Sequence, residues 1–159
     1  MRKYFLFTII TLISFTFSEV DCLGQEDGYG ICLSYENINP DTGYLEIHYN
    51  SLYDIAGFQM NISGVMIEDV TTGLGFLEFS VPTGFILGYL SGDYLPASED
   101  GVLLTLDFTP QGEVESCLNN IIIGGSGGVS FDPVSSDCVT ISSAYIDCDG
   151  VYGGLNLPE

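Results

Sequence analysis

The sequence predicts an all-β protein, folded as a two-sheet β-sandwich of about nine strands. Apolar and polar residues alternate with a period of two over many short stretches, which is typical of strands buried on one face. The chain contains 20 glycines, and all six prolines lie between those stretches or at their ends. No stretch longer than a turn or two has helical periodicity. We favour a sandwich over a barrel because each predicted strand has only one strongly apolar face.

The predicted strands follow one another at short intervals. In the clearest of them, residues 44–50, the polar face carries His48, the only histidine of the chain. The segment Asn39–Gly43 places Pro and Gly where a tight turn needs them, so it predicts a turn between two strands. Glu99–Gly101 and Gly124–Gly128 are predicted loops. The predicted strands are Tyr29–Glu36, Tyr44–Asn50, Phe58–Ser63, Gly64–Thr71, Phe76–Val81, Gly84–Leu90, Val102–Thr109, Leu118–Ile123 and Cys138–Ile146.

The N-terminus has the three-part pattern of a secretory signal peptide. Arg2 and Lys3 precede the uncharged apolar stretch Tyr4–Phe17, and small residues precede a cleavage site after Ser18. A membrane anchor is the alternative, but this stretch is short against the roughly 20 residues that span a bilayer. We therefore expect a secreted protein, extracellular or at the cell surface, with no membrane span after cleavage. The predicted organisation is a signal peptide (residues 1–18), a sandwich domain (19–146) and an acidic, glycine-rich tail (147–159).

The charge is strongly one-sided. The chain has 22 acidic residues and two basic ones, which gives a formal net charge of −20. Both basic residues lie in the predicted signal peptide, so the mature chain would contain neither Lys nor Arg. This excludes electrostatic binding to nucleic acid or to an anionic membrane, and it excludes lysine Schiff-base chemistry. Because 46% of the residues are apolar, the chain is not a disordered acidic tail.

Five cysteines are consistent with an oxidising compartment. Their spacing matches no zinc-binding pattern. We predict disulfides Cys22–Cys32 and Cys117–Cys138, the second joining two late strands, which leaves Cys148 without a partner. The connectivity cannot be read from spacing alone. Pairing of Cys138 with Cys148 is the arrangement that would overturn this prediction.

Several strand motifs resemble those of cohesin modules. Tyr53–Ile62 (YDIAGFQMNI) resembles the strand in which cohesins carry an apolar residue, Ala or Gly, Gly and Phe. Gly101–Phe108 (GVLLTLDF) resembles a later strand, and Val129–Asp132 with Val139–Ile141 resembles the closing pair. The pieces extend across about Tyr29 to Ile146. The resemblance implies a nine-stranded jelly-roll sandwich, an architecture that is shared with several carbohydrate-binding modules.

The same resemblance implies an extracellular, non-catalytic module. Cohesins either dock a calcium-loaded partner module or act in surface scaffolding and adhesion, so we expect a protein partner. A carbohydrate-binding module, with a polysaccharide as its ligand and calcium as an aid, is the alternative. Separately, Asp147–Gly154 (DCDGVYGG) resembles the DCxGVCGG units of some marine bacterial surface proteins, with Tyr152 replacing their second cysteine.

Two acidic segments are candidate calcium sites, although no cofactor is required. Asp147 and Asp149 form a partial acidic loop, but Pro158 stands where an EF-hand needs a bidentate Glu. A second group contains Asp93, Glu99 and Asp100. The alternative for each group is a solvated acidic loop. Because the chain repels itself, we expect it to be more stable with calcium or in high salt.

The candidate sugar-binding residues are Tyr89 and Tyr94, which flank a predicted loop and could stack on a sugar ring. Their alternative role is packing within the sandwich. Catalysis is not expected, because His48 is most simply an ordinary strand histidine. We therefore predict that the protein is not an enzyme, and a small hydrolase is a distant third alternative.

Overall fold

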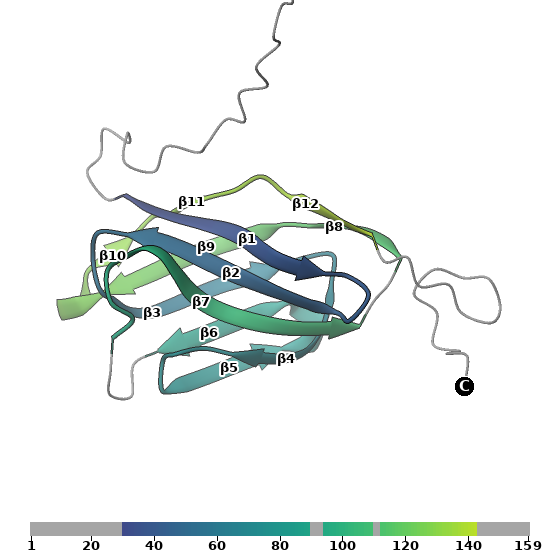
Figure 1. Ribbon diagram of the computed structural model, residues 1–159. Coiled ribbons are helices and arrows are strands. Elements are labelled where there is room, and N and C mark those ends of the chain that lie inside the picture. Colours follow the sequence, from purple (N-terminus) through teal and green to yellow (C-terminus); the bar gives the residue numbers. More distant parts are fainter. Residues whose placement is uncertain (1–29, 90–93, 110–111, 143–159) are drawn as a thin grey trace, which may run out of the picture.

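A computed structural model describes residues 30–89, 94–109 and 112–142 (Figure 1). The predicted signal peptide and the predicted tail lie outside these residues. Among the described residues, the only helical segments are two three-residue 3₁₀ turns, Val81–Thr83 and Ser126–Gly128. No helix in this part of the chain is long and apolar enough to cross a membrane.

Ten of the strands form two five-stranded sheets that face each other (Figure 1). All neighbouring strands are antiparallel except β1 and β11, which are parallel. Sheet A contains, in spatial order, β11 (Val134–Ser135), β1 (Ile31–Asn39), β2 (Tyr44–Ser51), β7 (Ser98–Thr109) and β4 (Met66–Thr71). Sheet B contains β10 (Ser130–Phe131), β9 (Leu118–Gly125), β3 (Ile55–Ile62), β6 (Phe85–Tyr89) and β5 (Phe76–Ser80). A separate pair consists of β12 (Val139–Ser142) and β8 (Glu113–Ser116).

One continuous core lies between the two sheets. Every second residue of each long strand points inward, because successive side chains of a strand alternate between its faces. The centre of the core contains fully buried aliphatic side chains from both sheets, including Leu45, Ile47 and Leu104 from sheet A and Met60 and Ile86 from sheet B. This two-layer arrangement confirms the predicted β-sandwich.

All nine predicted strands are present, with shifted ends. Three further strands were not predicted from alternation: β8, β10 and β11. Of these, β10 lies within Val129–Asp132, which the cohesin resemblance implied as a closing strand. Strands β10 and β11 contain only two residues each, too few to show an alternation. Strand β8 has the sequence EVES, whose single apolar residue gives no pattern. The predicted turn at Asn39–Gly43 is present, with Gly43 at a φ of 70°.

Two predicted loops were wrong. Glu99–Gly101 belongs to β7, which is longer than predicted because its polar start lies on the outer face of sheet A beside β2. The glycine at 101 has a packing role there: a Cβ atom would lie 2.3 Å from the Tyr49 ring. The second loop was wrong in part, because Gly124 and Gly125 end strand β9.

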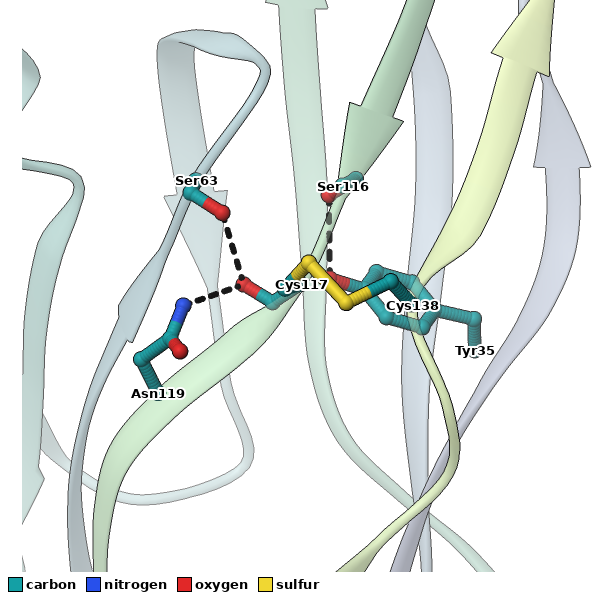
Figure 2. Close-up of a disulfide and its surroundings, with 6 residues drawn as sticks. All are labelled: Tyr35, Ser63, Ser116, Cys117, Asn119 and Cys138. Carbon is teal, nitrogen blue, oxygen red and sulfur yellow. Dashed lines mark hydrogen bonds between the residues drawn. A yellow bond between two sulfur atoms is a disulfide. The ribbon is translucent and has the colours of Figure 1, made fainter.

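A disulfide fastens β8 to β12. Cys117 follows β8 and Cys138 precedes β12, and their Cα atoms are 4.3 Å apart (Figure 2). This confirms the predicted Cys117–Cys138 bond between two late strands. Beside it, the hydroxyls of Tyr35 and Ser116 are hydrogen-bonded at 2.9 Å, and burial raises the pKa of Tyr35 to about 12. Cys32 is also disulfide-bonded; its predicted partner, Cys22, lies outside the described residues, as does Cys148.

Candidate protein-interaction surface

The outer face of sheet B carries several exposed apolar side chains and one acidic residue. Strand register places its residues in rows: Phe76 is opposite Tyr89, which is opposite Gly57, which is opposite Gly124. Directly opposed residues on neighbouring strands lie on the same face. We call the following set of outward-pointing residues the sheet B outer face: Gln59, Asn61, Phe76, Glu78, Ser80, Phe85, Leu87, Tyr89, Asn119 and Ile122.

Two aromatic rings stand together at one side of this face. The rings of Phe76 and Tyr89 are stacked, with centroids 4.4 Å apart and planes 29° from parallel. Yet 38% of Phe76 and 42% of Tyr89 remain exposed to solvent. Stacked rings lose rotational freedom in the free protein. They therefore form a preordered apolar surface, from which a partner could exclude water at low entropic cost.

Ile122 extends the apolar surface across β9. It is 46% exposed, whereas the next residue of the strand, Ile123, is fully buried in the core. Ile122 is directly opposite Gln59, and the next row toward the aromatic pair contains the backbones of Gly57 and Gly124. A Cβ atom on Gly124 would have only the backbone of Gly57 within 4 Å, so no side chain stands over this point. The surface is therefore flat as well as apolar.

The outer face of sheet A has the opposite character. Acidic residues lie on β1, β2, β4 and β7, and two pairs of them are directly opposed across strands: Glu36 with Glu46, and Asp69 with Asp107. Opposed like charges destabilise a sheet. By contrast, Glu78 is the only acidic residue of the sheet B outer face.

His48 is held at the centre of the sheet A outer face. Its Nδ1 atom is 2.5 Å from Oδ1 of Asp100 on β7, and its Nε2 atom is 2.7 Å from Oε2 of Glu46 on β2. Glu46 also accepts hydrogen bonds from the Tyr44 hydroxyl at 2.5 Å and from the Asn37 amide at 2.6 Å. The hydrogen bonds from Tyr44, His48 and Asn37 lower the pKa of Glu46 to about 2.

The structure places only some of the predicted site residues. Glu99 and Asp100 lie in β7, and Asp100 is engaged with His48. Among the described residues, no group of three or more His, Cys, Asp or Glu side chains is placed to hold a metal ion. Asp93, Asp147 and Asp149 lie outside those residues, so the two calcium sites stay predictions.

The two candidate sugar-binding tyrosines are both exposed. Tyr89 ends β6 and stacks on Phe76, and Tyr94, which is 45% exposed, precedes the short bridge between Leu95 and Ile55. Sequence reasoning missed Phe76 and Ile122. Each is followed in its predicted strand by another apolar residue, Leu77 or Ile123, and only the register shows which residue of the two points outward.

His48 was predicted to lie on the polar face of its strand, and it does. Its two ring nitrogens face carboxylates rather than a hydroxyl or a thiol. A catalytic triad needs the imidazole to activate a nucleophile on one side while an acid orients it on the other. The arrangement at His48 is therefore an ion cluster and not a triad.

Neither a protein-family model nor a curated protein sequence matches the chain. Three solved structures have a similar fold. A chain of the CaDoc0917–CaCohA2 complex at pH 5.5 has a TM-score of 0.55 at 15% identity, covering 72% of this chain and 99% of that one. A non-cellulosomal cohesin from the hyperthermophilic archaeon Archaeoglobus fulgidus has a TM-score of 0.54 at 15% identity, covering 72% and 91%.

The third is the cohesin module of a family 33 glycoside hydrolase from Clostridium perfringens, with a TM-score of 0.50 at 13% identity, covering 70% of this chain and 96% of that one. At such low identities the likeness concerns the fold. The described residues form a cohesin-like β-sandwich.

Proposed function

We propose that the protein is a non-catalytic interaction module that docks a protein partner on the sheet B outer face. The observation that carries this proposal is the joint exposure of Phe76, Tyr89 and Ile122 on one flat sheet surface. Exposed apolar patches on otherwise polar proteins typically mark interaction sites. Aromatic residues are also enriched among those that contribute most to protein–protein binding.

The class of partner follows from the fold likeness. One similar structure is a complex named for CaDoc0917 and CaCohA2. The resemblance of the strand motifs to cohesin modules implies docking of a calcium-loaded partner module. We infer that the partner here is a dockerin-like module. Calcium would then belong to the partner, so binding would depend on calcium without an ion site on this chain.

Secretion fits the same function. The predicted signal peptide and the disulfide Cys117–Cys138 both suit an oxidising extracellular compartment. We propose that the mature chain acts outside the cell or at its surface, in adhesion or scaffolding. Its net negative charge would keep a module with an apolar docking face in solution.

The test is calorimetric titration of the purified protein with a panel of calcium-loaded dockerin modules. We expect saturable one-to-one binding to at least one of them in millimolar calcium and none in chelator. No binding across the panel would overturn the dockerin-like partner.

Two matched variants then locate the site. Ile122→Asp places a charge on the sheet B outer face, and Val102→Asp does the same on sheet A at a residue of similar exposure, 42%. We expect the first variant to weaken binding at least about 30-fold, as for a residue central to an interface, and the second to leave it unchanged. Equal losses would contradict the proposed surface.

Carbohydrate binding is the second candidate function, and the exposed rings of Tyr89 and Tyr94 favour it. A flat aromatic face is a suitable platform for a sugar ring. The test is co-sedimentation with a panel of insoluble polysaccharides, in parallel with calcium and with chelator. Saturable binding that Tyr89→Ala or Tyr94→Ala removes would support this candidate, and no binding in either condition would exclude it for that panel.

A further inference from the structure

His48 joins two strands of sheet A. On β2 it is opposite Ser34 of β1 on one side and Val102 of β7 on the other. The register between β2 and β7 shifts next to His48, so the strand pairing is irregular at this point. Asp100 lies in a second irregular stretch of this pairing, between Gly101 and Ser98, and its link to His48 joins residues 52 positions apart in the sequence.

The geometry around the ring suits only one of its protonation states. A neutral imidazole has one N–H donor and one bare nitrogen, whereas an imidazolium has two donors. Both nitrogens of His48 lie within hydrogen-bond distance of carboxylate oxygens, which only accept. The doubly protonated ring therefore satisfies both contacts, and the loss of one proton sets a bare nitrogen against a carboxylate.

The two carboxylates are not held equally. Glu46 is 16% exposed at its side chain and is fixed by Tyr44 and Asn37 as well as by His48. Asp100 is 79% exposed. Among the side-chain hydrogen bonds of the described residues, its carboxylate has one partner, His48. When repulsion begins, Asp100 is the group that can move away into solvent.

We propose that His48 is a proton-operated latch on sheet A, which joins Glu46 to Asp100 when the ring is doubly protonated and releases Asp100 when it is not. A cavity of about 280 Å³ lies beside the latch, and Glu36, Glu99 and Asp100 are among the residues that line it. Release of Asp100 would open the β7 side of this cavity. The latch is on sheet A and the proposed docking face is on sheet B, so a test that contradicts one proposal leaves the other untouched.

The groups around the ring favour its charged form. Glu46 of β2, to which Tyr44 donates, and Asp100 of β7 contact the ring. Glu36 of β1 and Glu99 of β7 line the same cavity. Partial burial of the ring opposes protonation, but the hydrogen bonds to Asp100 and Glu46 outweigh it, so the pKa of His48 is raised above the ordinary 6.5. The stabilisation is thus complete below pH 6.5 and is lost as pH rises through the raised pKa.

The test is an NMR titration of the purified protein from pH 5.5 to 9.5, which is unambiguous because the chain has one histidine. We expect a His48 midpoint above 6.5, and we expect the carboxylate carbon and backbone amide of Asp100 to shift with the same midpoint. A His48 midpoint at the ordinary value, or an Asp100 signal that does not follow it, would overturn the latch.

Two variants separate the contact from general electrostatics. Asp100→Asn removes the charge that touches the ring, and Asp107→Asn removes an equal charge from the same strand away from it. We expect the first to lower the His48 midpoint clearly and the second to change it little. Equal shifts in both variants would mean that bulk charge, and not the latch, sets the titration. Since Asp100 is exposed, folding of the first variant is expected.

Discussion

The two sheets share one core but present opposite outer faces to solvent. Sheet A is acidic outside, with Glu36, Glu46, Asp69 and Asp107 arranged in opposed pairs, and it is neutralised locally by one histidine. Sheet B is apolar outside, with stacked rings and an exposed isoleucine. The alternation that builds the core therefore leaves the outer faces free to differ, and that difference points to function.

The apolar face is tolerated because the rest of the molecule is so strongly charged. A net charge of −20 makes copies of the chain repel one another, which opposes self-association through the sheet B outer face. A partner that lacks such negative charge would not be repelled. The acidic face of sheet A thus limits the choice of partner at the opposite side of the molecule.

The largest expected effect on the free energy of unfolding is the difference between a residue on the inner face of sheet B and its neighbour on the outer face. Ile122 and Ile123 are neighbours on β9, the first exposed and the second buried. Ile123→Ala should lower the free energy of unfolding by about 2–5 kcal/mol, because it leaves a cavity in the core. Ile122→Ala should lower it by no more than about 0.5 kcal/mol. Chemical denaturation measures both, and equal costs would show that Ile122 is structural.

The disulfide is expected to stabilise the fold without taking part in binding at the outer face of either sheet. Replacing Cys117 and Cys138 together with Ala removes a crosslink that closes a loop of 21 residues. We expect the free energy of unfolding to fall by about 2–4 kcal/mol, with partner binding unchanged in the folded protein. The paired substitution is preferable to a reducing agent, which would also attack the disulfide of Cys32. An unchanged denaturation midpoint would contradict this role.

The stacked rings should stabilise each other even though both are exposed. In a double-mutant cycle of Phe76→Ala and Tyr89→Ala, we expect a coupling energy of about 0.5–1.5 kcal/mol. The cycle compares the denaturation midpoints of the two single variants and the double variant. Strict additivity would mean that the pair is not preordered in solution, and the sheet B outer face would then be less ready to bind.

The smallest expected effect comes from the opposed acids of sheet A. Asp107→Asn relieves the repulsion with Asp69 and should raise stability by about 0.2–1 kcal/mol in dilute buffer, and by less in high salt. Asp100→Asn should act in the opposite direction at pH 6, because Asp100 contacts the protonated His48. Thermal denaturation at low and high salt measures both. A change of the same sign in both variants would show that the two carboxylates do not differ.

Sequence reasoning recovered the fold class and the positions of nine strands, because these depend on local alternation. The predicted Cys117–Cys138 bond is also present, although spacing alone does not determine the connectivity. It missed β11, and only the cohesin resemblance pointed to β10, because strands of two residues show no alternation. It also took Glu99–Gly101 for a loop, because a polar stretch next to glycine predicts one unless the neighbouring strand is known.

The candidate surface was harder to predict. The sequence singled out Tyr89 but not Phe76 or Ile122, because each of these two is followed by another apolar residue and the sequence does not show which of the pair points outward. His48 was placed on the correct face, but its contact with Asp100 depends on the register of two strands that are distant in sequence. Pairings of this kind are set by the whole fold, and no local motif encodes them.

The most direct test of the docking face is NMR chemical-shift mapping of the protein with a bound dockerin module. The account predicts that the largest changes fall on Phe76, Leu87, Tyr89 and Ile122 of sheet B, while the residues around His48 on sheet A change little. Changes centred on the outer face of sheet A would contradict it.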